Sequence, residues 1–101
     1  MAIVLKVKLH KGGMTMANGQ KNRIDVTIHG TSYKIIGTES VEQIRLVASL
    51  VNDKMTEISE MNPNLDTARL AVLTAVNAVN EYVELQKYVE QLEQELKKLK
   101  G

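Results

Sequence analysis

The feature that most constrains this chain is its last third, which is predicted to form one uninterrupted helix. No glycine or proline occurs from Thr67 to Lys100, and Asp66 is a favourable N-cap residue just before that stretch. A helix of this length extends about 50 Å at a rise of 1.5 Å per residue. Its first half is rich in alanine, leucine and valine and has almost no charge before Glu81. The question for the fold is what covers this surface in a chain of 101 residues.

The apolar residues of this helix fall into two rows. One is a seam in which spacings of four and three alternate over four heptads, as in a coiled coil; its members are Ala71, Ala75, Ala78, Tyr82, Leu85, Val89, Leu92, Leu96 and Leu99. The second row ends near Val83 and comprises Leu65, Val72, Val76, Val79 and Val83, with Leu70 and Leu73 beside it. The pattern therefore predicts two partners for the first half of the helix and one for the second half.

We expect the second row to pack against the chain's own hairpin and first helix, and the seam to face a second copy of the chain. Burying the five large aliphatic residues of the seam after Tyr82 contributes at most roughly 8–15 kcal/mol before ordering entropy. The chain also has no phenylalanine and no tryptophan, so a monomeric core would have to be built from small side chains. Both observations favour an oligomer over a monomeric bundle with a frayed tail.

A β-hairpin is predicted before the helices. Ile24, Val26 and Ile28 alternate with polar residues, His29–Ser32 supply the turn, and Tyr33–Ile36 form the return strand. A two-stranded ribbon is only marginally stable by itself. Its apolar face therefore needs a helix or a further strand against it.

An amphipathic helix is predicted from Val41 to about Met61. Ser40 and Gln43 have the spacing of a capping box, and Asn62-Pro63 ends the helix. Its apolar positions are Val41, Ile44, Ala48, Val51, Met55 and Ile58, joined by Val47 and Leu50. The expected fold class is α+β: an N-terminal β-hairpin, one amphipathic helix, and a long helix that ends in a coiled coil, in an oligomer.

The first fifteen residues are set apart from this pattern. The residues from Ile3 to Leu9 alternate as in a strand. The codons for Lys11-Gly12-Gly13 can form a purine run that pairs with the ribosome a short distance before Met16. Met1–Thr15 is therefore either a translated leader or expression artefact, or a genuine extra edge strand. The segment contains three lysines and no acidic residue, so without it the net charge changes from +1 to −2.

The sequence lacks the residue patterns that are typical of most catalytic sites. Cysteine is absent, which excludes disulfides, a thiol nucleophile and a thiolate metal site. The two histidines are isolated, and neither a serine elbow nor a glycine-rich phosphate loop is present. The carboxylates lie on polar helix faces without metal-ligand partners. We therefore expect no enzyme activity, no catalytic residue, no cofactor, no metal and no small-molecule substrate.

Charge and hydropathy narrow the partners further. A formal net charge of +1 does not favour nucleic acid as a partner. No apolar run approaches the roughly 20 residues that span a bilayer. The simplest expectation is a cytosolic protein that has no membrane partner.

Three segments carry a specific combination of motifs: VTIHGTSYKIIGTES, RLVASLVNDKMTEISEMNPNLD and LAVLTAVNAVNEYVEL. The first contains I-x-G-x-x-Y-x-I-x-G. Together they resemble the ZapA family of bacterial cell-division proteins, in its short Bacillus-like form, over about residues 23–100. The resemblance implies a non-enzymatic cytoplasmic protein at the midcell division site, which binds the tubulin-like GTPase FtsZ and bundles its protofilaments. It further implies a head that dimerises and a coiled coil that pairs dimers into tetramers.

No family motif assigns the FtsZ contacts residue by residue. The candidates are the charged residues expected to be exposed on the head, namely Lys34, Arg45, Lys54, Glu57, Glu60 and Arg69. More distant members of the family have a basic residue after the hairpin glycine, where this chain has Thr31. This departure disfavours a contact centred on the turn.

The interpretation divides the chain into residues 1–15, a head over residues 16–83 that dimerises and binds FtsZ, and a coiled-coil tail over residues 84–101. The expected partners are FtsZ and further copies of the chain, as a dimer or a tetramer. Two alternatives stay open. One is a generic coiled-coil dimerisation module with another partner; the other is a small nucleic-acid-binding dimer that uses the lysines of the first segment and the tail.

Overall fold

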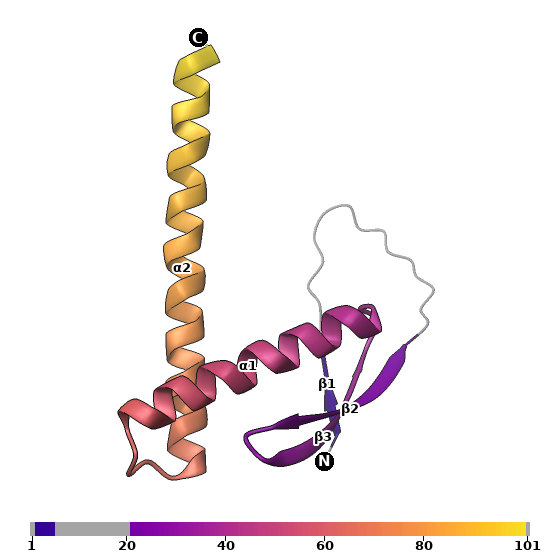
Figure 1. The fold of residues 1–101 in the computed structure, drawn as a ribbon. Coiled ribbons are helices and arrows are strands. Elements are labelled where there is room, and N and C mark those ends of the chain that lie inside the picture. Colours follow the sequence, from indigo (N-terminus) through magenta and orange to yellow (C-terminus); the bar gives the residue numbers. More distant parts are fainter. Residues whose placement is uncertain (1, 6–20, 101) are drawn as a thin grey trace. The chain divides into compact units, whose positions relative to one another are not determined.

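Five elements of secondary structure follow one another in the structure, a computed structural model that describes residues 2–5 and 21–100. They are the strands β1 (Ala2–Val4), β2 (Asn22–Ile28) and β3 (Thr31–Gly37) and the helices α1 (Val41–Met61) and α2 (Thr67–Lys100) (Figure 1). The chain divides into two compact units, Met1–Glu57 and Ile58–Gly101. The predicted α+β class is confirmed.

The first unit contains a three-stranded sheet in the order β1–β3–β2. β2 and β3 pair antiparallel, with Ile24 opposite Ile35 and Asp25 opposite Lys34. β1 pairs parallel to β3, with Ile3 opposite Ile35. Side chains alternate between the two faces of a sheet. One face therefore carries Ile3, Ile24 and Ile35, and the other carries the Asp25–Lys34 pair.

The hairpin between β2 and β3 is tighter than predicted. Its two turn residues, His29 and Gly30, have φ angles of 50° and 79°, and positive φ at both central positions is what a type I′ turn requires. Thr31 already pairs with Ile28, so the expected four-residue turn was two residues too long. The backbone N–H of His29 donates to Oδ1 of Asn52 at 2.8 Å, which ties the turn to α1.

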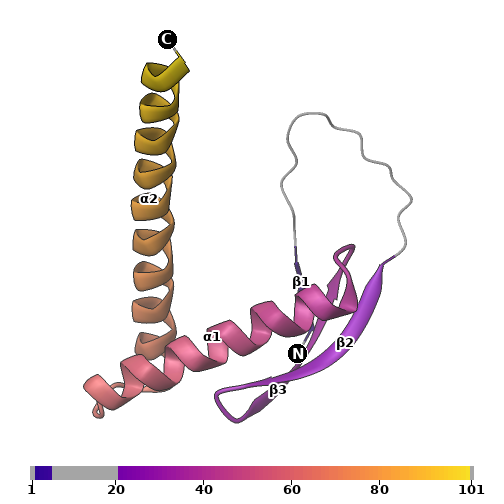
Figure 2. The same ribbon diagram turned by 45° about the horizontal axis from the view of Figure 1, so that its top comes forward.

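α1 lies across the apolar face of this sheet, as both views show (Figure 1, Figure 2). Its predicted bounds are confirmed, and Oγ of Ser40 accepts the N–H of Gln43 at 3.0 Å as an N-cap. The core of the unit consists of buried residues from α1 and β3, with half-buried residues from β2 and one that directly follows β1. These residues are Ile35, Ile44 and Ala48, packed with Leu5, Ile24, Val26 and Ile28.

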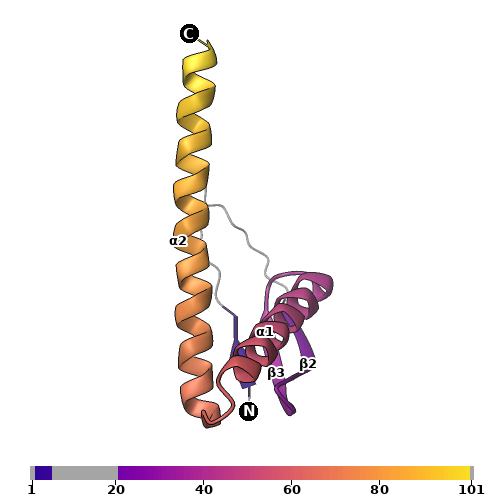
Figure 3. The ribbon, with the colours of Figure 1, turned by 60° about the vertical axis from the view of Figure 1, so that its left-hand side comes forward.

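The second unit contains the corner after α1 and the long helix. The N–H of Asn62 donates to the carbonyl of Ile58 at 3.0 Å, so the helix ends where Pro63 was expected to end it. Oδ1 of Asp66 accepts the N–H of Arg69 at 2.8 Å and caps α2. Figure 3 shows α2 as one continuous helix to its end. Its predicted bounds are confirmed.

The expected burial of the second row holds only in part. Leu70 is buried and Leu73 is half-buried, whereas Val72, Val76 and Val79 are 64%, 58% and 59% exposed. Thr74, which was not assigned to that row, is buried as well.

Leu73 and Asn77 are half-buried on the same side of α2. Oγ1 of Thr74 donates to the carbonyl of Leu70 at 2.8 Å, and Nδ2 of Asn77 donates to that of Leu73 at 3.0 Å. Polar residues that bond to their own helix backbone need no other partner. Thr74 and Asn77 can therefore lie in a covered row that the sequence pattern assigned to valine.

The structure describes only part of the segment 1–15. Ala2–Val4 forms β1, and the N–H of Leu5 donates to the carbonyl of Ile36 at 2.7 Å. The rest of the segment lies outside the described residues. The translation start considered at Met16 lies outside them too.

Candidate functional site

The first candidate surface is the row of nine residues from Ala71 to Leu99 defined above, called here the α2 seam. All nine side chains are exposed. The large ones range from 43% exposed at Val89 to 84% at Leu99. Because their spacing alternates between four and three, they follow one side of the helix. A continuous apolar row that the chain does not cover is typical of an interaction surface.

A second exposed row runs directly beside the seam in the first half of α2. Val72, Val76, Val79 and Val83 each follow a seam residue by one position, and all four are exposed. One step along a helix turns by about 100°, so the two rows together form a broad apolar surface. That surface narrows after Val83.

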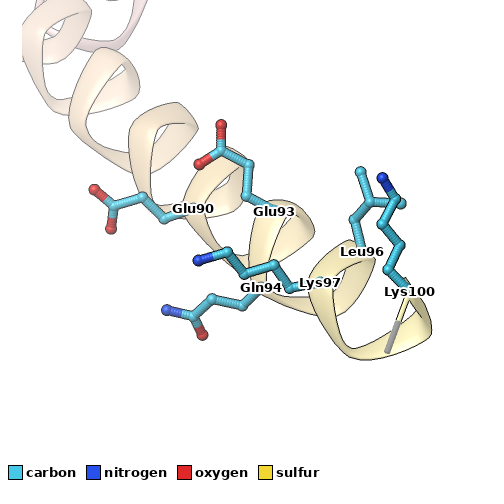
Figure 4. Close-up of a pocket in the computed structure, with 6 residues that line it drawn as sticks. All are labelled: Glu90, Glu93, Gln94, Leu96, Lys97 and Lys100. Carbon is cyan, nitrogen blue, oxygen red and sulfur yellow. The ribbon is translucent and has the colours of Figure 1, made fainter.

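The same row becomes polar in the second half of α2. Its positions there are Gln86, Glu90, Glu93, Lys97 and Lys100. Figure 4 shows the last four of these projecting from one helix around a shallow hollow, with Gln94 and Leu96. The side chains of a single exposed helix do not enclose a ligand, and here two carboxylates balance two ammonium groups. The exposed surface thus changes from two apolar rows to one after Val83, where the sequence pattern also changes, although the valine row was expected to be covered.

α1 also exposes apolar side chains that the sequence analysis placed less well. Leu46 and Leu50 are 57% and 56% exposed, and Val47 and Val51 are each 36% exposed. The covered row of α1 is therefore narrower than predicted, and Val51 is at its margin. The spacing of four between Leu46 and Leu50, on a side away from Ile44, was the signal that could have identified this patch.

The second candidate surface is the set of charged residues proposed to contact FtsZ. Lys34 lies on the sheet face opposite the core, where its Nζ is 2.9 Å from Oδ1 of Asp25. Both side chains are largely exposed, so this cross-strand ion pair contributes little to stability. Arg69 is exposed in the first turn of α2.

The four charged candidates on α1 do not form one cluster. Arg45 and Lys54 are nine residues apart, about two and a half helical turns, so they point to opposite sides of α1. Glu57 follows Lys54 by three residues, and Glu60 follows Glu57 by three, so each is a neighbour of the previous one. Arg45, Glu57 and Glu60 are exposed, and Lys54 is half-buried. The helix therefore brings together Lys54, Glu57 and Glu60, but not Arg45.

Two other kinds of site are absent from the described residues. Across residues 2–5 and 21–100, no cluster of three or more histidine, aspartate or glutamate side chains is placed to bind a metal ion. None of the helices in that part of the chain is long and apolar enough to cross a membrane. A second hollow on α2 is lined by Tyr82, Leu85, Gln86, Val89 and Glu90 and belongs largely to the seam.

Comparisons with known proteins agree with the fold. The family model "Cell division protein ZapA" matches residues 24–100. A protein of that name from Geobacillus sp. (strain WCH70) is 55% identical over 85 residues, which are 84% of this chain and 98% of the relative. One from Bacillus thuringiensis (strain Al Hakam) is 47% identical over 85 residues, 84% of this chain and 96% of the relative.

A solved structure is similar as well. It is described as "ZapA mutant dimer from Geobacillus stearothermophilus", with 47% identity and a TM-score of 0.62. The match covers 84% of this chain and 99% of that one. The family model spans β2 from Ile24 onward, β3 and both helices, and therefore the residues of both candidate surfaces. This chain belongs to the ZapA family of cell-division proteins.

Proposed function

We propose that this chain is a non-enzymatic cell-division adaptor that binds FtsZ in the cytoplasm at midcell and crosslinks its protofilaments. Membership of the ZapA family supports the role in division. The resemblance stated for the sequence supports FtsZ as the partner. The observation that carries the proposal is the α2 seam, an apolar row over four heptads that the chain leaves exposed.

The exposed seam supports self-association through α2. Apolar side chains of this size are unfavourably exposed to water in a single chain. Their burial against a partner chain is the main favourable term in association. The solved Geobacillus relative is described as a dimer. The adjacent valine row gives the first half of α2 a second face to bury. We therefore assign residues 84–101 to a coiled-coil tail and residues 16–83 to a dimerising head.

Self-association supplies the mechanism of crosslinking. A single head that binds one subunit of a filament cannot join two filaments. A particle with two or more heads converts the second contact into an effectively intramolecular one, so weak contacts become sufficient. The FtsZ contacts are assigned to the charged head residues, with Lys54, Glu57 and Glu60 as the patch on α1 and Arg45, Lys34 and Arg69 as separate positions.

Sedimentation with FtsZ tests the proposal directly. FtsZ is polymerised with GTP, mixed with the chain, and centrifuged at high speed to measure binding and at low speed to measure bundling. Binding should saturate at a fixed ratio of chain to FtsZ, and light scattering should rise on mixing. Absence of the chain from the high-speed pellet would refute FtsZ as the partner.

The nucleic-acid alternative is separated by a mobility-shift assay at physiological salt. α2 ends with Lys97, Lys98 and Lys100, but Glu90 and Glu93 lie in the same stretch, so no uniform basic stripe is formed. We expect no shift with double-stranded DNA. A shift that persists in the chain begun at Met16 would favour the alternative.

A further inference from the structure

The edge of β3 that faces away from β2 pairs with very few residues. β2 occupies one edge of β3 over seven residue pairs, whereas β1 occupies the other over three. The N–H of Leu5 donates to the carbonyl of Ile36 at 2.7 Å. The N–H and C=O of one strand residue point to the same edge, and alternate residues point to opposite edges. The main-chain groups of Lys34 and Ile36 therefore face β1, and those of Tyr33 and Ile35 face β2.

The same edge has a position for one aliphatic side chain beside Gly37, which Leu5 occupies and which is called here the seat. Leu5 is half-buried and packs against the buried core of the first unit. A Cβ atom at Gly37 would meet Oε1 of Glu39 at 2.6 Å, Cβ of Leu5 at 3.2 Å and the carbonyl oxygen of Leu5 at 3.4 Å, so glycine at this position eases the close approach of Leu5. Val4, on the other face of the strand, is 64% exposed. Recognition at this edge thus depends on Leu5.

Relatives of this chain show that the rest of the head is complete without β1. The family model begins at residue 24, after β1. The solved Geobacillus structure is matched over 99% of its length by 84% of this chain, so the remaining residues of this chain have no counterpart in it. The match to the family therefore does not require β1. β1 is an added occupant of an edge that the remaining strands already form.

We propose that this edge of β3 is a strand-binding site, which takes a short extended apolar peptide parallel to β3 with one aliphatic side chain seated over Gly37. Residues 2–5 of the chain are its exchangeable occupant. Main-chain hydrogen bonds to Lys34 and Ile36 provide affinity, and the seat provides selectivity, as in other cases of strand addition. Because residues 2–5 are linked covalently to the edge, their effective concentration there is about millimolar. A free peptide of the same sequence should therefore occupy the edge to a similar extent when it is added at about millimolar concentration.

Residue-resolved amide hydrogen exchange tests the occupancy in the full chain. In Leu5→Ser the amides of Lys34 and Ile36 should exchange at least about tenfold faster, because the strand loses its anchor. The amides of Tyr33 and Ile35 should keep their protection, which reports an intact hairpin. The matched control Val4→Ser removes a side chain from the exposed face and should change neither pair. Equal effects of the two substitutions would overturn the role of the seat.

A peptide of residues 1–8, added to the chain begun at Met16, tests the exchange. Without the peptide, the amides of Lys34 and Ile36 should be unprotected while those of Tyr33 and Ile35 remain protected. Millimolar peptide should restore the protection of the first pair, and the same peptide with Leu5→Ser should not.

Three results would overturn the proposal. One is protection of the Lys34 and Ile36 amides before any peptide is added, which would mean that another strand covers the edge. The others are failure of millimolar peptide to restore protection and equal restoration by the serine peptide. None of these results bears on FtsZ binding, so this site and the proposed function are tested separately.

Discussion

Replacing two leucines of the α2 seam with glutamate should weaken self-association strongly. Leu92 and Leu96 are 45% and 57% exposed in the single chain. Full burial of a leucine contributes about 1.5–3 kcal/mol, so burial of the exposed half contributes about 0.7–1.5 kcal/mol. A dimer contains four such side chains, which together contribute about 3–6 kcal/mol. This corresponds to an increase of about 100-fold to 20,000-fold in the dissociation constant, and burial of the new charges adds to it.

The matched control is the double variant Gln91→Glu and Gln94→Glu. It adds the same two charges to the same two turns of α2, but at positions outside the seam. Sedimentation equilibrium over a wide concentration range measures the dissociation constant of each variant, and circular dichroism checks that α2 is helical at high concentration. The control should remain within about tenfold of the unaltered chain, since it changes only exposed charge. If both variants dissociate equally, the seam is not the interface and the reasoning is refuted.

Three further predictions concern the head. Charge reversal at Lys54 should weaken FtsZ binding in co-sedimentation without changing the oligomeric mass. Reversal at Arg45, on the opposite side of α1, should show which side of the helix is used. Unchanged binding in both variants would exclude α1 as the contact. Ile44→Ala should lower the free energy of unfolding by about 2–5 kcal/mol in a urea titration, because Ile44 is 0% exposed; a loss below 1 kcal/mol would contradict its place in the core. Gly30→Ala should lower it by about 1–2 kcal/mol through backbone strain alone, since φ is 79° and no atom lies within 4 Å of the added Cβ; an unchanged stability would show that the turn relaxes.

The bounds of both helices were predictable because local chemistry determines them. Ser40 and Asp66 each accept a backbone N–H at the first turn of a helix, and Asn62-Pro63 separates the two helices. The α2 seam was predictable for a related reason, because a long apolar row at coiled-coil spacing is visible in sequence alone. These features depend on residues close to each other along the chain.

The choice of the covered row on α2 was not predictable from periodicity. The pattern shows two apolar rows, but it does not show which one the chain itself covers. Valine looked better suited to burial than Thr74 and Asn77, yet both polar side chains bond to their own helix backbone and tolerate partial or full burial. The sequence left two alternatives for the first fifteen residues, a leader or an edge strand. It did not decide between them because β1 pairs with residues of β3 that lie far away along the chain.

The candidate FtsZ contacts were the least predictable part. Charge and expected exposure selected six residues without showing which lie together. Helical geometry alone separates Arg45 from Lys54, and sheet alternation places Lys34 on the face away from the core. Exposure did not single out any of them, because charged residues are exposed on most surfaces.

The central claim is that oligomerisation through α2 is what allows this chain to crosslink FtsZ. The most direct test is low-speed sedimentation of FtsZ filaments with the Leu92→Glu and Leu96→Glu variant, at a concentration where it has been shown not to oligomerise. The account predicts that the variant still binds filaments in high-speed pellets and no longer bundles them, while the Gln91→Glu and Gln94→Glu control does both. Bundling by a variant that stays monomeric would contradict the account.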